Sequence, residues 1–112
     1  MLVYKILRAA EFAELVAAGE SPGAPVDRAD GYVHFSTAAQ AAETAARHFA
    51  GEDGLWLLAC EADALGPALR WEPSRGGALF PHLHRPLTRA DILWARPLGR
   101  SADGRHDLGS LA

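Results

Sequence analysis

The chain has 112 residues, 49% of them hydrophobic and 22% charged, with a formal net charge of −3. This length and composition are typical of one globular domain, 1–112, and exclude a mostly disordered chain. The acidic balance, with Lys5 as the only lysine and the arginines spread along the chain, excludes nonspecific binding to a nucleic-acid backbone.

The first part of the chain predicts a strand, a helix and a loop. Apolar and polar residues alternate over 2–7, and 9–18 is amphipathic with helical spacing before Gly19 ends it. Residues 21–27 are rich in proline and glycine, which indicates a loop.

A second strand leads directly into a second helix. Residues 31–37 are rich in aromatic and β-branched types, and a period of two places His34 and Ser36 on the same face. Thr37 is followed three residues later by a glutamine, which is the spacing of a capping box. The helix that it opens is expected to end near residue 49.

The second half predicts short strands. The run 55–61 is continuously apolar before its final residue, so we expect a central strand covered on both faces. Residues 70–72 form a short strand, 74–77 a tight loop and 78–84 an extended piece. Because proline donates no ladder hydrogen bond, Pro81 predicts an edge strand or a bulge there.

The chain closes with a turn over 87–91, a strand over 92–96 and a polar tail over 99–112. The order of elements predicts an α+β fold with a small mixed or split β-sheet flanked by two main helices. The longest apolar run, 55–60, is far shorter than the roughly 20 residues that span a bilayer. With no export signal visible and a lone cysteine in that run, we expect a cytoplasmic protein without membrane contact.

The junction between the second strand and its helix is the first candidate site. His34 and Ser36 face the same way just before a helix N-terminus, where hydrogen-bond donors lie beside a partial positive charge. Such a place suits an anionic or polyhydroxylated ligand. The alternative is that Thr37 or Ser36 only caps the helix and His34 is a hydrogen-bonded core residue.

Two later segments are the other candidates. In the first, Ser74 and Arg75 can hold an anion while Gly76 and Gly77 let the backbone approach a ligand; the alternative is an ordinary loop. Glu72 stands beside them as a carboxylate that could stabilise a cationic transition state or be a solvated surface group.

In the other segment, His82 and His84 point to one side of an extended strand, as two metal ligands do. His34 could complete such a set, but no acidic partner or cysteine pair has a diagnostic spacing, so we expect ligand contact or packing without a metal. Motifs of the common serine hydrolases, phosphate loops and dinucleotide-binding folds are absent.

Three stretches, 30–37, 44–49 and 70–84, together resemble the bacterial and plant family called domain of unknown function 952. The likeness covers nearly the whole chain. One departure is His84, where the family pattern leads us to expect an aromatic residue such as tyrosine.

The family is in turn similar to the ADP-ribosyltransferase-like fold, which includes RNA 2′-phosphotransferases. That likeness implies a split sheet around a cleft of the size of NAD, with NAD as a substrate. His34 would bind a ribose hydroxyl, Ser36 would orient the nicotinamide or its ribose, and Arg75 would hold the pyrophosphate. The glutamate that many members carry at the start of a late strand has no clear counterpart, since Glu72 is not clearly at that position.

Three functions remain open from the sequence. The first is an enzyme, ADP-ribosyltransferase-like or phosphotransferase-like, that acts on NAD or on an ADP-ribosyl or 2′-phosphate nucleotide. The second is a non-catalytic module that binds a nucleotide or small anion, and the third is a structural or protein-interaction domain.

Overall fold

The computed structural model describes residues 1–111, and within them eight strands form three small sheets. The strands are β1 (Leu2–Arg8), β2 (Glu20–Ser21), β3 (Val33–His34), β4 (Leu55–Glu61), β5 (Leu69–Pro73), β6 (Leu79–Leu83), β7 (Leu87–Thr88) and β8 (Ile92–Leu98). The helices are α1 (Ala9–Ala18), α2 (Pro25–Asp30), α3 (Ala38–His48) and α4 (Ala62–Leu65). The 3-10 turns are η1 (Gly66–Ala68), η2 (Arg75–Gly77) and η3 (Arg89–Asp91).

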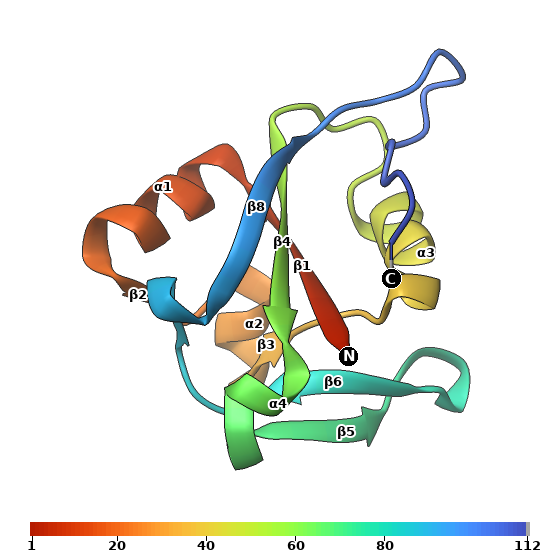
Figure 1. The fold of residues 1–112 in the computed structure, drawn as a ribbon. Helices are drawn as coiled ribbons and strands as arrows, with labels where there is room; N and C mark the ends of the chain where they lie inside the picture. The colour runs from red at the N-terminus through yellow and green to blue at the C-terminus, as the bar shows by residue number, and fades with distance from the viewer. Residues whose placement is uncertain (112) are drawn as a thin grey trace.

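The main sheet has the strand order β1-β4-β8, with the apolar strand β4 at its centre, as the sequence predicts. Helices α1 and α3 lie on opposite sides of this sheet (Figure 1). The two faces of the sheet belong to two separate apolar clusters. Leu15 of α1 packs with Leu58 in one, and Ala45 of α3 packs with Leu57 in the other. Both faces of β4 are therefore buried, which explains why its sequence shows no alternation.

The second sheet has the order β3-β6-β5, so β6 is its central strand. The expectation that Pro81 marks an edge or a bulge is wrong, because Pro81 pairs with Trp71 in regular register. The Pro81 carbonyl points toward Phe35 and accepts its backbone N–H at 2.9 Å. Pro81 therefore lacks only the return bond from its own nitrogen, just beyond His34, the last residue of β3.

A single bridge joins these two sheets. The backbone groups of Tyr4 and Ser36 exchange two hydrogen bonds, of 2.8 and 2.9 Å, along the free side of β1. The chain after β3 therefore runs against β1 before it enters α3. This bridge fixes how β3 and β6 lie relative to the main sheet.

The α+β class and the two longest helices, α1 and α3, agree with the sequence analysis, but two details differ. Every strand pair in residues 1–111 is antiparallel, so the sheet is split rather than mixed. Helix α2 begins at Pro25, inside the segment 21–27 that was expected to be a loop, and is followed by Gly31 with φ of 85°. Proline is well tolerated at a helix start, which is why the segment is compatible with both structures.

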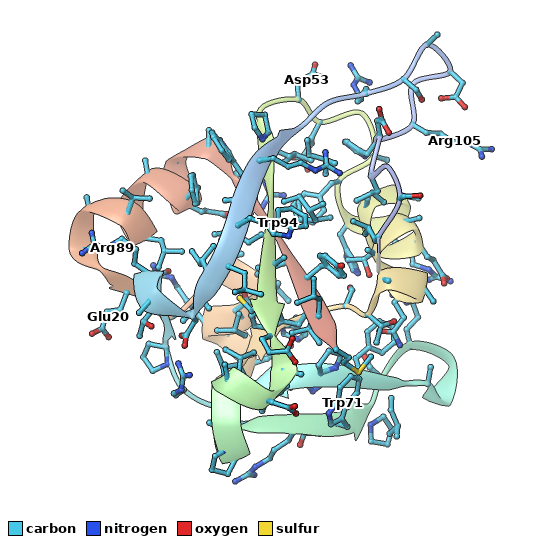
Figure 2. All side chains as sticks on the ribbon, viewed as in Figure 1. Glu20, Asp53, Trp71, Arg89, Trp94 and Arg105 are labelled. Atoms are coloured by element: carbon cyan, nitrogen blue, oxygen red, sulfur yellow. The ribbon has the colours of Figure 1, made fainter. Side chains whose placement is uncertain are left out.

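The outer surface carries many charged side chains and some apolar ones. Charged side chains such as Glu20, Asp53, Arg89 and Arg105 lie exposed around it, while Trp94 on β8 is partly exposed (Figure 2). In the described part of the chain, no helix is long and apolar enough to cross a membrane.

Candidate functional site

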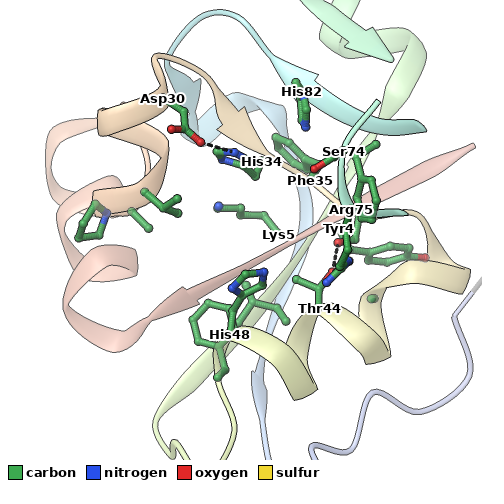
Figure 3. A pocket seen from close by; sticks show the side chains of 18 of the residues that line it. Tyr4, Lys5, Asp30, His34, Phe35, Thr44, His48, Ser74, Arg75 and His82 are labelled. Atoms are coloured by element: carbon green, nitrogen blue, oxygen red, sulfur yellow. Dashed lines mark hydrogen bonds and ion pairs between the residues drawn. The ribbon is translucent and has the colours of Figure 1, made fainter. Parts of the chain in front are cut away.

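A cavity of about 720 Å³ lies between strand β1, helix α2, helix α3 and the second sheet. Its polar wall includes Lys5, Asp30, His34, Thr44, Arg75 and His82. Its apolar wall includes Pro25, Val26, Phe35, Phe49 and Phe80. Several polar side chains from these different elements, among them Lys5, His34 and His82, surround one common space (Figure 3).

A fully buried carboxylate, Asp27, lies behind this wall. Its Oδ2 is 2.7 Å from Lys5 Nζ and accepts the backbone N–H of Ala24 at 2.7 Å. Its Oδ1 accepts the backbone N–H of His34 at 3.0 Å and contacts the ring Nδ1 of His34 at 2.6 Å. One aspartate thus ties β1, the start of α2 and β3 together at the cavity.

These contacts decide the charge of Asp27. Burial favours the neutral acid, but the hydrogen bond from His34 and the positive charge of Lys5 outweigh it and lower the pKa of Asp27 to about 2. The carboxylate is therefore ionised, and an ionised carboxylate only accepts hydrogen bonds. Nδ1 of His34 must carry a proton and donate it to Asp27.

The other ring nitrogen of His34 also meets a carboxylate. Nε2 is 3.0 Å from Oδ2 of Asp30, the last residue of α2 and four residues earlier in the chain. The side chain of Asp30 is 45% exposed, whereas that of Asp27 is wholly buried. His34 is therefore held rigidly on one side and loosely on the side that faces the cavity.

A second imidazole–carboxylate group lies on the neighbouring strands. Glu72 Oε1 is 2.9 Å from His82 Nδ1 and 2.7 Å from His84 Nε2. These hydrogen bonds, first from His84 and then from His82, lower the pKa of Glu72, so both imidazoles donate to it. The ring of Tyr32 lies against His82 and His84, with centroids 4.3 and 5.0 Å away.

The third polar group of the cavity is centred on Arg75. Its Nη2 donates to Thr44 Oγ1 at 3.1 Å, and Thr44 Oγ1 in turn lies 2.8 Å from Ser36 Oγ. The guanidinium lies over the ring of Phe80, 4.8 Å from the centroid. Among the buried side-chain nitrogens and oxygens of residues 1–111, only Arg75 Nη1 lacks a hydrogen-bond partner. A buried donor without an acceptor is unfavourable, so this nitrogen marks a place where an acceptor is missing.

The positive charge of Arg75 also acts on His48, a residue of α3 that lines the same cavity. Partial burial and then the charge of Arg75 lower the pKa of His48, so this imidazole is neutral near neutral pH. The cavity therefore presents cationic and neutral donors together.

Five of the nine residues predicted from the sequence line the cavity: His34, Ser36, Ser74, Arg75 and His82. The other four lie outside its wall.

Thr37 caps α3 by accepting the backbone N–H of Gln40 at 3.3 Å, as its capping-box spacing predicts. Gly76 and Gly77 form the exposed turn η2 with φ of 67° and 80°. His84 lies behind the wall with Glu72, so the place where the family pattern has an aromatic residue holds an imidazole that packs on Tyr32.

The sequence analysis missed Lys5 and Asp27. A signal for Lys5 existed, because a lone lysine inside an apolar strand must be buried with a partner or emerge at an edge. Asp27 had a weaker signal, three residues after Ala24, which is the capping-box spacing of a helix that starts at Pro25. The sequence offered no sign that the two would meet.

The fold and the cavity define a small α+β protein with a histidine-lined cleft between small antiparallel sheets. The family model described as "Protein of unknown function (DUF952)" matches residues 6–95, and the chain belongs to this family. The resemblance noted in the sequence is thereby confirmed at the level of the family.

Solved structures of protein CC0527 from Caulobacter crescentus are similar to this chain over nearly its whole length. The X-ray crystal structure is 49% identical, covers 96% of this chain and 95% of its own, and has a TM-score of 0.92. The solution NMR structure of CC0527 is 50% identical, with coverage of 96% and 93% and a TM-score of 0.87. No curated protein matches this chain.

Proposed function

We propose that the cavity binds a small phosphorylated ligand of nucleotide type, with a phosphate against Arg75. The observation that carries this proposal is Arg75 Nη1, a buried cationic donor without an acceptor among residues 1–111. Guanidinium groups pair with phosphate through parallel charge-assisted hydrogen bonds, so a phosphate oxygen supplies what this nitrogen lacks.

The rest of the cavity suits the remainder of such a ligand. Its volume of about 720 Å³ falls in the range of small-molecule sites, roughly 300–1,000 Å³. Val26, Phe35 and Phe49 give it an apolar wall on which a base or another flat ring can pack. Ser36 and His34, which also line the cavity, offer hydrogen bonds to sugar hydroxyls.

NAD and ADP-ribose are the first ligands to test. The resemblance to the ADP-ribosyltransferase-like fold implies a cleft of their size, and both carry a pyrophosphate that Arg75 could hold. In this proposal His34 and Ser36 contact the ribose next to the reacting bond, while Ser74 contributes a hydroxyl beside Arg75.

A thermal-shift and calorimetry panel tests the proposal. NAD, NADP, ADP-ribose, a 2′-phosphorylated nucleotide and inorganic phosphate are added to the wild-type protein and to Arg75→Met. A ligand that binds only the folded state adds about 2.7 kcal/mol at a hundred times its Kd, which shifts the melting temperature visibly.

The matched control is Arg47→Met. Arg47 is an exposed arginine on α3 whose Nε lies 3.0 Å from Glu43 Oε1, so its removal leaves the cavity unchanged. We expect a shift with at least one nucleotide that disappears in Arg75→Met and persists in Arg47→Met. The absence of any shift, or an equal shift in both variants, would overturn the proposal.

A further inference from the structure

Two histidines face the cavity from neighbouring strands. His34 on β3 and His82 on β6 are direct cross-strand partners, and their ring centroids are 5.2 Å apart with the planes inclined at 67°. Behind each ring an ionised carboxylate holds Nδ1: Asp27 behind His34 at 2.6 Å, and Glu72 behind His82 at 2.9 Å. A carboxylate in this position fixes the tautomer and the orientation of an imidazole, so Nε2 is the nitrogen left to contact other groups, and in His34 it also meets Asp30.

The two rings differ in where their protons lie. Both nitrogens of His34 face carboxylates, and a carboxylate only accepts hydrogen bonds, so a proton on either nitrogen has an acceptor beside it. His82 has a hydrogen bond only at Nδ1, and within residues 1–111 its Nε2 meets no partner. The ring of His82 is almost wholly buried, and this burial lowers its pKa. Nε2 of His34 is thus placed to carry a proton, and Nε2 of His82 is placed to accept one.

We propose that His34 and His82 act as general acid and general base in the hydrolysis of a phosphodiester bound in this cavity. This inference rests on the proposed binding of a phosphate at Arg75 and adds the reaction that the ligand undergoes. A neutral base beside a protonated acid is the arrangement needed to activate a water molecule and to release an alcohol in one step.

The reaction balances with water as the only co-reactant. Nε2 of His82 takes a proton from water while the water oxygen forms a bond to phosphorus. The bond from phosphorus to the leaving oxygen breaks, and that oxygen takes the proton from Nε2 of His34. The products are a phosphate monoester and an alcohol. His82 then loses a proton to solvent and His34 regains one.

Arg75 and Asp30 complete the arrangement. Nη1 of Arg75 would bind a non-bridging phosphate oxygen, whose negative charge increases as water attacks. Asp30 Oδ2 lies 3.0 Å from Nε2 of His34. Its side chain is half exposed, so it can turn into solvent when the leaving oxygen takes its place.

Two thymidine 5′-phosphodiesters provide the test because they differ only in the leaving group. One is thymidine 5′-phosphate p-nitrophenyl ester, whose weakly basic leaving oxygen departs without a proton. The other is thymidylyl-thymidine, whose sugar alkoxide needs one. General acid or base catalysis is worth roughly 10²–10⁴-fold, so the loss of either group is easily measured.

We expect wild-type protein to hydrolyse both esters. The His82→Gln variant should hydrolyse both esters roughly 100-fold or more slowly than wild type. The His34→Gln variant should show a similar loss of hydrolysis rate on thymidylyl-thymidine. On the p-nitrophenyl ester its rate should fall only a few-fold. The control is His106→Gln, because the ring of His106 bonds to the Glu52 carbonyl at 2.9 Å, away from the cavity wall.

The comparison of two esters within one variant keeps the result independent of folding. Equal losses of His34→Gln on both esters would show that His34 has only a structural role. Thymidine 5′-phosphate binding is measured by calorimetry alongside. Binding without turnover of either ester in wild-type protein overturns this inference and leaves the proposed function standing. If thymidine 5′-phosphate and the nucleotide panel all fail to bind, both proposals fail.

Discussion

Replacing Asp27 with asparagine should destabilise the protein strongly near neutral pH and much less in acid. The side chains of Asp27 and Lys5 are 0% and 7% exposed, so Asp27→Asn leaves a buried ammonium without its counter-charge. Breaking such a pair from one side costs about 3–5 kcal/mol of unfolding free energy. For a domain of this size, that corresponds to a fall in melting temperature on the order of 10–20 °C.

The pH dependence follows from the lowered pKa of Asp27. A fall from the ordinary value of 3.8 to about 2 stabilises the folded state by about 2 kcal/mol at neutral pH. Because the unfolded chain takes up the proton first, this stabilisation is complete above the unfolded pKa and is lost as the pH falls through about 2. The difference in unfolding free energy between wild type and Asp27→Asn should therefore be smaller by about 1–2 kcal/mol at pH of about 2.5 than at neutral pH.

Urea unfolding followed by circular dichroism at the two pH values measures this difference. Asp63→Asn is the control, because Asp63 is an exposed aspartate on α4 and its removal should change the unfolding free energy by less than about 0.5 kcal/mol. The double variant Lys5→Met with Asp27→Asn should recover part of the loss, since no unpaired ammonium remains. Two results would refute the charge assignment at Asp27. One is a difference in unfolding free energy between wild type and Asp27→Asn that stays constant with pH, and the other is a difference below about 1 kcal/mol at neutral pH.

Three further predictions concern separate parts of the molecule. Thr37→Ala removes the cap of α3 and should lower the unfolding free energy by about 1 kcal/mol in urea titration; no change would mean that the cap bond is not formed in solution. Imidazole titration by NMR should find the pKa of His82 below the usual 6.5 of histidine. In Glu72→Gln this pKa should be lower still, because the hydrogen bond to Glu72 raises it. A higher pKa of His82 in that variant would contradict the assigned hydrogen bond. Burial raises the pKa of Cys60 to about 12, so a thiol reagent at mildly alkaline pH should modify it only after unfolding, and rapid labelling of the native protein would disprove this.

The elements that the sequence predicts well are those whose signal is local. Strand β4, with bounds Leu55–Glu61, and helix α1, with bounds Ala9–Ala18, match their expected ranges. Each depends on a periodicity and a stop signal contained within the element. The cap of α3 at Thr37 is correct for the same reason, because the capping box spans only a few residues.

The site was less predictable because it depends on pairings between distant segments. His34 and His82 were both candidates, but only the register of β3 against β6 makes them partners. Glu72 was weighed as a carboxylate for the cleft, whereas the structure places it behind His82 as the acceptor for two imidazoles. Asp27 was assigned to a loop, and its importance depends on Lys5, which lies on a different element. No spacing rule connects such residues before the fold is known.

The burial of Lys5 has a practical consequence for the chemistry of the whole protein. It is the only lysine in the sequence, and its amine lies closed against Asp27 at 2.7 Å. This amine is ion-paired and almost wholly buried, so we expect acylating reagents to modify it only when its contact with Asp27 opens. The rate at which Lys5 is acylated, followed by mass spectrometry, reports the opening of that one contact, in the same way that amide exchange reports local unfolding. Acylation of Lys5 thus measures the local stability of the region that holds His34.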